Sequence, residues 1–312
     1  MLEIIISALL PIVVTLALGY FAAWHKDFNS DQSTVLNRLV MLYALPLTLF
    51  SGMLGVKRSV LLEQSDMALV LFISMVGAYI VVFVVSHSVF RRSKPIAALQ
   101  ALAVAAPSGP FIGIPVLGFL YGELSSIPVS LCGIIINLIL VPFTLFSLST
   151  YSSNKEGGNE KVSIAANLKN TLKEPIIWMP VLAFVILILD FQIPENILKS
   201  LKLLGTTTGG IALFSTGIIL YSQKVTFNLT ILTSVIAKNI IVPVITLGIC
   251  LLMAIKGTVA DLSIMTIALP AATISVILAM QYKIAEQEMA STFFFSTVLS
   301  IATMAAFLVY LH

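Results

Sequence analysis

The stretch AAPSGPFIGIP, residues 105–115, places three prolines and two glycines within eleven residues. This composition is typical of a loop. However, no charged residue occurs between Pro95 and Gly122, and this span is apolar enough to lie in a membrane. Proline removes an amide donor and clashes with the carbonyl four residues earlier, so the stretch predicts an unwound helix. Unwound backbone at that depth is tolerated only against protein or a water-filled cavity, which makes the stretch a candidate site.

The composition indicates an integral membrane protein. The chain has 312 residues, 59% hydrophobic and 10% charged, with a mean hydropathy of +1.06, whereas a soluble domain carries about 25% charged residues. Apolar spans near the length that a bilayer requires, about 20 residues, predict an all-α fold and exclude a transmembrane barrel. We predict ten transmembrane helices, at 4–24, 39–56, 67–90, 96–120, 126–149, 175–190, 203–222, 229–255, 262–282 and 289–311.

The distribution of Lys and Arg predicts the orientation. Eleven lie in odd-numbered loops, five in even-numbered loops and one, Lys238, inside a span, which accounts for all seventeen. Because cytoplasmic loops carry the excess of positive charge, both termini are predicted to face outward from the cytoplasmic (inner) membrane. Cys132 and Cys250 fall within spans, so we expect neither a disulfide nor a metal framework. No cofactor and no nucleic-acid partner are expected.

Internal similarity predicts two repeats. LTLFS at 47–51 resembles ALFS at 212–215, the pair Asp27-Phe28 matches Asp190-Phe191, and Pro107 matches Pro270, all at a shift of 163 or 164. A polar cytoplasmic linker separates the halves. The predicted organisation is a first five-helix repeat at 1–150, a linker at 151–174 and a second repeat at 175–312. An odd number of spans inverts the second repeat relative to the first, as in many secondary transporters.

The two repeats carry matching interruptions, in helices 4 and 9. Pro107 lies about 16 Å from the basic edge at Lys94 by helical rise, close to the bilayer middle. In the ninth span, ALPAATIS at 268–275 places Pro270 at similar depth, followed by Thr273 and Ser275. Interrupted helices at equivalent positions indicate a substrate site where they cross. Their half-helix N-termini offer free amides that suit an anion.

Lys238 is the only charged residue well inside a span. A central lysine costs about 2.5–3.5 kcal/mol on insertion scales, so it requires a partner. Two interpretations stay open: Lys238 attracts an anionic substrate, or it neutralises the carbonyl ends of the broken helices. No Asp or Glu lies equally deep, so neither a carboxylate sodium site nor a carboxylate proton relay is evident. Sodium bound by carbonyls and hydroxyls stays open.

Asn137 and Asn239 are further buried amides. Each either bonds helix to helix or lines the cavity. The complete predicted substrate site comprises Pro107, Ser108, Gly109, Pro110, Gly113, Asn137, Lys238, Asn239, Pro270, Ala271, Thr273 and Ser275. We find no constellation of nucleophile, base or metal ligands, and therefore do not expect an enzyme.

Four motifs resemble the auxin efflux carrier family, within the bile/arsenite/riboflavin transporter superfamily. They are FIGIPVLGFLYGE at 111–123, VMLYALPLTLFSG at 40–52, KNIIVPVITL at 238–247 and ALPAA at 268–272. The motif at 40–52 resembles the signature of the bacterial malonate-permease branch. The similarity covers essentially the whole chain.

This resemblance implies a scaffold domain of helices 1, 2, 6 and 7, a transport domain of helices 3–5 and 8–10, and an elevator-type movement. It also implies a homodimer through the scaffold helices. Many members have an asparagine just before the break in helix 4, which helps to hold indole carboxylates, whereas this chain has Ala-Pro-Ser-Gly-Pro. The expected substrate is therefore a small dicarboxylate, such as malonate or malate. The alternatives are an exporter of another weak acid or amino acid, and a receptor that uses the same cavity without transport.

Overall fold

The computed structural model describes residues 2–55, 64–155, 173, 175–191, 193–223 and 225–311. Every regular element within these ranges is helical, apart from one isolated β-bridge. Six helical segments are long and apolar enough to cross a membrane: Ser30–Leu54, Ser65–Val89, Ile127–Ser149, Glu195–Ser222, Leu229–Leu252 and Glu286–Leu311. The described part of the chain is therefore all-helical, and its long apolar helices are those of a membrane protein.

The described residues of the first half form helices that several π-helical segments (η) continue. In order they are α1 (Leu2–Trp24), α2 (Ser30–Leu39), η1 (Val40–Ala44), α3 (Leu45–Leu54), α5 (Ser65–Val84), η2 (Val85–Val89), α6 (Lys94–Ala105), η3 (Gly109–Gly113), α7 (Ile114–Tyr121), the 3₁₀ turn η4 (Gly122–Ser125), α8 (Ser126–Ile135), η5 (Ile136–Leu140) and α9 (Val141–Lys155). π-Helical segments occur mostly as single turns within α-helices and are frequent at functional sites.

The described residues of the second half are also helical. Its elements are α11 (Pro175–Ile188), α12 (Glu195–Gly205), α13 (Thr207–Gln223), α14 (Leu229–Ile236), η6 (Ala237–Ile241), α15 (Val242–Leu252), α16 (Thr258–Ile267), α17 (Thr273–Tyr282) and α18 (Glu286–Leu311). Helix α9 continues five residues past the predicted end of the first repeat at 150. Residues 156–172 and 174 of the predicted linker lie outside the described residues.

One helix begins earlier than its apolar span predicts. The second predicted span starts at residue 39, whereas α2 starts at Ser30. Asn29 and Gln32 form a reciprocal cap, in which the Gln32 amide donates to Asn29 Oδ1 and the Asn29 amide to Gln32 Oε1, both at 2.9 Å. Such a capping box satisfies two of the donors that a helix start leaves free. Buried Asn37 on this polar segment donates to the Ile277 carbonyl of α17 at 3.1 Å.

Both predicted interruptions are present. Helix α6 ends at Ala105 and regular structure resumes with η3 at Gly109, while α16 ends at Ile267 and α17 begins at Thr273. Every residue of α6 from Ala97 to Ala105 is buried. Other helices therefore shield the interrupted backbone from lipid, as the membrane requires of unwound chain.

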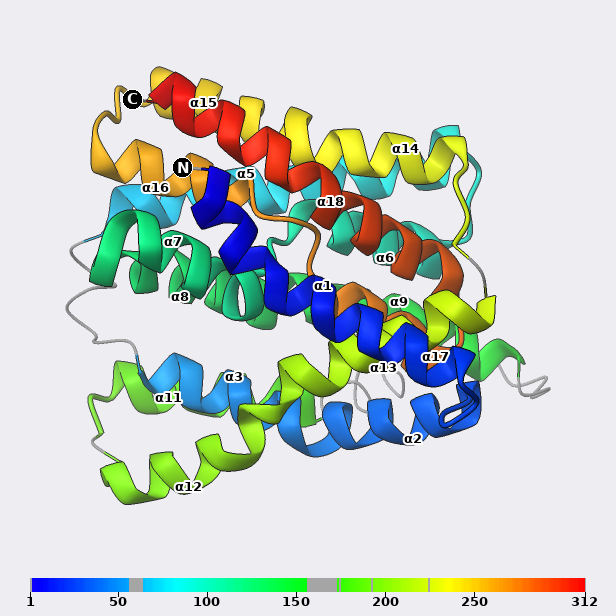
Figure 1. Cartoon of the computed structure of the whole chain (residues 1–312). Coiled ribbons are helices and arrows are strands. Elements are labelled where there is room, and N and C mark those ends of the chain that lie inside the picture. Colours follow the sequence, from blue (N-terminus) through cyan, green and yellow to red (C-terminus); the bar gives the residue numbers. More distant parts are fainter. Residues whose placement is uncertain are drawn as a thin grey trace.

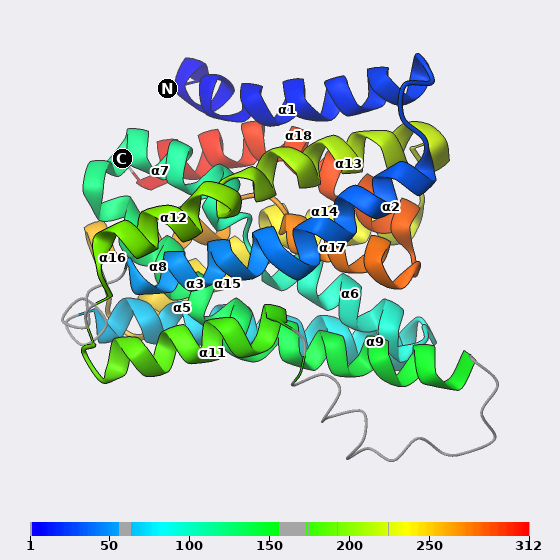
Figure 2. The ribbon, with the colours of Figure 1, turned by 90° about the horizontal axis from the view of Figure 1, so that it is seen from below.

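Helix α1 packs along α13, α13 contacts α2, and α3 contacts α11 and α12. Helix α5 packs on α6, α6 on α9, and α18 on α14 and α17, and α18 also contacts α1 and α13. Figure 1 shows α2, α3, α11 and α12 in its lower part and α5, α14 and α15 in its upper part. The two termini lie at the same end of the molecule, as both views show (Figures 1 and 2).

Candidate functional site

The two interruptions meet. Pro107 and Ala271 form the isolated antiparallel bridge, and the Ser108 amide donates to the Pro270 carbonyl at 3.0 Å. The Ser108 and Thr273 hydroxyls lie 3.2 Å apart. The residues that break helices 4 and 9 therefore build one crossing, which lies inside the protein.

Proline and glycine explain why the chain takes this path. The Gly109 amide donates to the Pro107 carbonyl at 2.9 Å, and the Gly113 amide returns to the Ser108 carbonyl at 3.1 Å, which starts η3. A Cβ atom on Gly113 would lie 2.8 Å from Leu269 Cδ1. Glycine at this position therefore lets the Leu269 side chain pack directly against η3, and a larger residue would displace that side chain.

A hydroxyl from α18 ties the crossing to helix 8. The Ala271 amide donates to Ser296 Oγ at 2.9 Å, and that hydroxyl donates to Asn239 Oδ1 at 2.6 Å. The Asn239 side-chain amide donates back to the Ser296 carbonyl at 2.8 Å. All three residues are buried. Asn239 therefore holds α18 and, through Ser296, the unwound backbone, which agrees with the helix-to-helix interpretation. Sequence reasoning missed Ser296, because one serine in TFFFSTVLS carries no distinguishing signal.

We predict that Ser296→Ala lowers the free energy of unfolding by about 1–3 kcal/mol, because it leaves a buried amide of Ala271 and the Asn239 carbonyl oxygen unpaired. Thermal unfolding in detergent measures the change. Ser300→Ala is the matched control on the same helix, since the buried Ser300 hydroxyl bonds only its own helix, to the Thr297 carbonyl. The control is expected to change stability by less than about 1 kcal/mol. Equal losses for both variants would contradict the role of Ser296.

Lys238 lies in η6 and is completely buried. Its Nζ donates to the carbonyl of Ile267, the last residue of α16, at 3.1 Å. The C-terminus of a helix carries a negative partial charge, which an ammonium stabilises. Among the buried side chains that the structure describes, Lys238 is the only charged one. This contact matches the second of the two interpretations of Lys238, and it places the positive charge at the edge of the crossing.

A small cavity of about 50 Å³ adjoins the crossing. Its lining residues are Leu45, Thr48, Leu49, Pro107, Ser108, Gly133, Ile136, Asn137, Ala272, Thr273 and Ile274. One water occupies about 30 Å³ of liquid, so this space holds about one or two. A larger solute requires the walls to separate.

Two polar residues, Asn137 and Thr48, belong to the cavity wall outside the crossing itself. Asn137, in η5, has a buried Oδ1 with no hydrogen-bond partner. This oxygen is therefore available as a hydrogen-bond acceptor. Thr48 of α3 bonds the Gly205 carbonyl at 2.5 Å and the Thr208 hydroxyl at 2.9 Å. Thr48 was absent from the predicted site, although it lies within LTLFS, one of the repeat motifs.

The structure divides the predicted site residues into three groups. Pro107, Ser108, Asn137 and Thr273 line the cavity. The supporting residues are Gly109, Gly113, Asn239, Pro270, Ala271 and Ser275, whose hydroxyl bonds the Ala272 carbonyl in the first turn of α17. Lys238 is not among the lining residues. The backbone of Pro110 belongs to η3, whereas its side chain lies outside the described part.

The cavity wall is mainly aliphatic, and its few polar groups are neutral. Hydroxyls, an amide and the N-terminal turn of α17 surround it, and none of the described lining residues is charged or aromatic. No cluster of metal-ligating side chains occurs among the residues that the structure describes. The few polar groups can orient a small solute, and the positive end of α17 favours a negative one.

Comparison with known proteins gives a consistent result. The family described as membrane transport protein matches residues 4–308. An uncharacterised transporter of Escherichia coli, YfdV, is 30% identical over 286 residues, covering 91% of this chain and 90% of that protein. An uncharacterised transporter of Methanocaldococcus jannaschii is 24% identical, covering 96% of each chain. The auxin efflux carrier component 8 of Arabidopsis thaliana is 23% identical, over 97% of this chain and 96% of that one.

Proposed function

The chain belongs to the membrane transport protein family, the auxin efflux carrier family, and from this premise we propose that it carries a small dicarboxylate such as malonate or malate. The observation that supports this substrate class is the cavity at the crossing. Ser108, Thr273 and Asn137 face it with hydroxyl and amide groups, α17 begins there at Thr273, and the charge of Lys238 lies at the other end of the same interruption.

The size of the cavity favours a small aliphatic substrate over an indole acid. An indole acid is the bulkier of the two, so the walls around this space of about 50 Å³ would have to separate much further to admit it. Two carboxylates instead require several donors within a short distance. The crossing offers these as hydroxyls, a side-chain amide and the first amides of a helix.

We also propose an elevator-type movement between two domains. The scaffold would comprise α1, α2, α3, α11, α12 and α13, and the remaining helices would form the transport domain. The cavity lies at this boundary, because Thr48 belongs to α3 whereas Ser108, Asn137 and Thr273 belong to the other set. Sliding of one set past the other would enlarge the cavity and open it to one side. A homodimer through the scaffold helices completes this proposal and rests on the family resemblance alone.

Ten spans in two inverted repeats provide the framework for this movement. Helices lie over each of the ten predicted spans in their described residues, and the interrupted segments meet antiparallel, as inverted halves would. The end of α17 and the start of α6, with Arg91, Arg92, Lys94 and Lys283, lie opposite the termini (Figure 1). This arrangement supports a cytoplasmic basic end and outward-facing termini.

Uptake by proteoliposomes tests the proposal. Purified protein is reconstituted, and entry of labelled malonate, malate and indole-3-acetate is measured with and without sodium and proton gradients. We expect uptake of a dicarboxylate and none of the indole acid above protein-free vesicles. Transport of the indole acid alone, or of none of the three, would overturn the substrate class.

Filling the cavity is expected to reduce this uptake. Gly133 lines the cavity, and a Cβ atom there meets no atom within 4 Å. Gly133→Leu would therefore fold and occupy the substrate volume, and we expect uptake to fall by roughly tenfold or more, as for a lost pocket contact of about 1–3 kcal/mol. Gly52→Leu is the control, since Gly52 has equally open surroundings on α3 and does not line the cavity. Equal uptake by the two variants would place the substrate elsewhere.

A further inference from the structure

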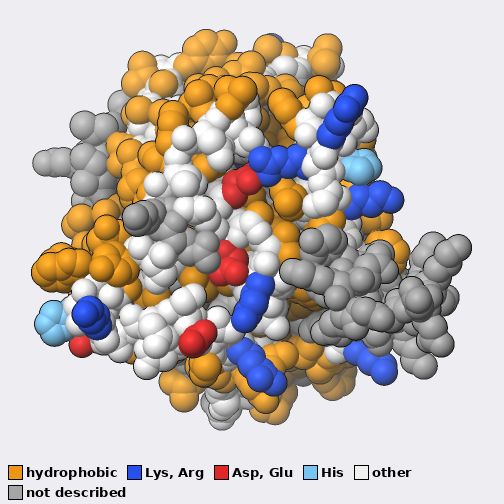
Figure 3. Space-filling view, turned by 90° about the vertical axis from the view of Figure 1, so that its right-hand side faces the viewer, with side chains coloured by type: hydrophobic (Ala, Val, Ile, Leu, Met, Phe, Trp, Pro, Cys, Tyr) orange, Lys and Arg blue, Asp and Glu red, His pale blue; other side chains and the backbone are white. Residues whose placement is uncertain are grey.

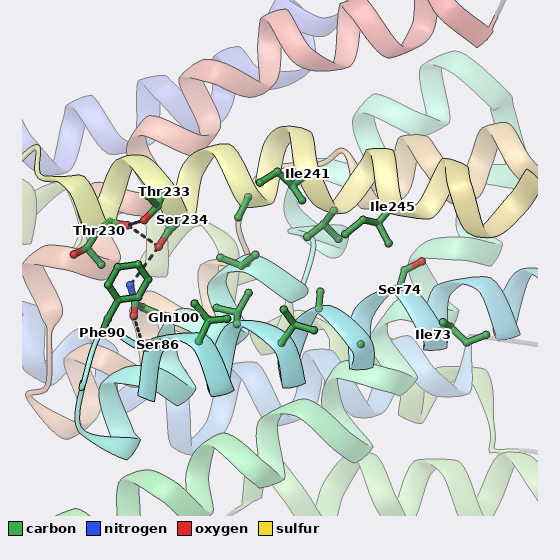
Figure 4. Close-up of a pocket in the computed structure, with 18 of the residues that line it drawn as sticks. Ile73, Ser74, Ser86, Phe90, Gln100, Thr230, Thr233, Ser234, Ile241 and Ile245 are labelled. Carbon is green, nitrogen blue, oxygen red and sulfur yellow. Dashed lines mark hydrogen bonds between the residues drawn. The ribbon is translucent and has the colours of Figure 1, made fainter. Parts of the chain in front are cut away.

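Another, much larger cavity lies away from the crossing. It is a groove of about 550 Å³ between α5 and the helix formed by α14, η6 and α15, with Gln100 and Val104 of α6 among its lining residues. Figure 4 shows Ile73 and Ser74 on one wall and Ile241 and Ile245 on the other. The lining on α5 and η2 runs from Ile73 to Ser86, which is about 20 Å of helix. The groove is thus longer than one bilayer leaflet, about 15 Å.

The groove exists because several of its lining residues have small side chains. Gly77 and Ala78 lie in its α5 wall and Ala237 in its η6 wall, and a Cβ atom on Gly77 would meet no atom within 4 Å. The remaining lining along this length is mainly valine and isoleucine. An apolar space of this kind does not hold ordered water, so within a membrane hydrocarbon fills it.

One end of the groove is polar. The Ser86 hydroxyl donates to Gln100 Oε1 at 2.5 Å, and Gln100 Nε2 donates to Ser234 Oγ at 3.3 Å. Figure 4 shows these residues gathered with Thr230 and Thr233 at the end where Phe90 lies. These hydrogen bonds pair the polar side chains at this end with one another. We therefore expect the hydrocarbon of a bound molecule to end here and its polar part to begin.

Unpaired positive charge flanks this polar end. Arg92 is held there, with a bidentate contact to Glu288 at 2.7 and 2.9 Å and a bond to the Thr230 hydroxyl at 3.0 Å. Arg91 and Lys94, on either side of it, are exposed and have no ion-pair partner among the described residues. Figure 3 views this end of the molecule and shows Lys and Arg side chains projecting from it. The local excess is therefore two positive charges.

We propose that the groove binds one acyl chain of an anionic phospholipid, whose phosphate lies beside Arg91 and Lys94. The groove has the length and apolar lining for a single chain, and the basic end complements a negative headgroup. The walls come from α5, α6 and α14–α15, so the bound lipid contacts α6, the first half of the interrupted helix 4. This inference requires only that the chain lies in a membrane, and it stands or falls independently of the transported substrate.

Native mass spectrometry of the purified full chain in detergent tests the proposal. The protein is titrated with phosphatidylglycerol and, separately, with phosphatidylcholine of the same acyl chains. We expect wild type to retain one phosphatidylglycerol at a concentration roughly twenty-five-fold lower than it needs to retain one phosphatidylcholine, since each of the two basic side chains near the headgroup contributes a factor of about five. Gly77→Leu is expected to remove this first bound lipid, and Gly248→Leu to keep it. Gly248 lies on α15 with open surroundings and does not line the groove.

A further variant keeps the test decisive if Gly77→Leu fails to fold. Arg91→Gln combined with Lys94→Gln changes only exposed side chains, and we expect it to abolish the preference for phosphatidylglycerol while one lipid still binds. Equal binding of both lipids by wild type would leave nonspecific annular lipid as the occupant and overturn the proposal. Retention of the preference in the double variant would also overturn it.

Discussion

Gly217→Leu is expected to eliminate the folded protein. A Cβ atom at Gly217 would overlap the carbonyl oxygen of Leu16 and lie 2.8 Å from the Tyr20 amide nitrogen. The contact is reciprocal, since a Cβ atom at Gly19 would overlap the Phe214 carbonyl oxygen. All of these are backbone atoms, which cannot rotate away as a side chain does. Any side chain at Gly217 must therefore separate α1 from α13.

This separation is costly because packing, and not the hydrophobic effect, holds helices together in lipid. Small residues let two backbones approach and gain dispersion contacts along their length. Overpacking a well-packed interior costs about 1–3 kcal/mol when side chains can adjust. Here backbones collide, so we expect a larger loss. Size-exclusion chromatography after detergent extraction measures this loss. We expect aggregated or degraded protein, whereas wild type elutes as one monodisperse peak.

Gly210→Leu provides the control on the same helix. Gly210 is exposed, and a Cβ atom there meets no atom within 4 Å. The same leucine is introduced into α13 in both variants, so a difference between them reports the contact with α1 and not helix propensity. We expect Gly210→Leu to elute as wild type does. A monodisperse Gly217→Leu variant with an unchanged thermal midpoint would show that the two helices are not packed this closely.

The sequence predicts the interruptions well because their causes are local. Proline and glycine act on the backbone of their own turn, and depth follows from the distance to a charged edge. Pro107 and Pro270 therefore indicated both breaks, and the breaks meet. The pairing of Gly19 with Gly217 was not predicted, because it depends on two helices far apart in sequence. No local pattern distinguishes these glycines from Gly210.

The direction in which each side chain points could not be predicted from the sequence either. A π-helical turn adds one residue to the repeat and rotates everything that follows, so an α-helical projection assigns the wrong face. Asn137 lies in η5, and Lys238 with Asn239 lies in η6. The sequence identified all three as unusual, yet it left open whether each faces the cavity or another helix. In the structure the answers differ: Asn137 lines the cavity, Asn239 bonds Ser296, and Lys238 caps α16.

The bond to the last carbonyl of α16 explains the position of the Lys238 side chain. It does not explain why this buried position carries a charged residue and not a neutral one. Removing a charged group from water costs several kcal/mol, and a single carbonyl partner returns only part of it. Replacing a buried charge by an apolar side chain of similar volume is often neutral or stabilising. Lys238 is therefore a poor choice for stability alone. Its remaining value is electrostatic, as a positive charge fixed beside the crossing in a medium of low dielectric.

We therefore predict that Lys238→Met preserves stability and loses anion binding. The lost bond to the Ile267 carbonyl costs about 1–3 kcal/mol, which the removed desolvation cost offsets, so the thermal midpoint without ligand should change by only a few degrees. If the anion binds at the crossing within roughly 6–8 Å of the ammonium, Coulomb's law gives about 2–3 kcal/mol at an effective dielectric constant of about 20. The affinity for labelled malonate should fall by a factor of about 30–150.

Lys256→Met removes the same charge from an exposed loop and is expected to leave both stability and affinity unchanged, because solvent screens a surface charge. The comparison separates a local field at the crossing from the net charge of the protein. If Lys238→Met binds malonate as wild type does, the charge has no role in recognition. If it instead unfolds many degrees earlier, the ammonium serves chiefly as the cap of α16, and the anion must be held by the hydroxyls, the amide and the helix terminus alone.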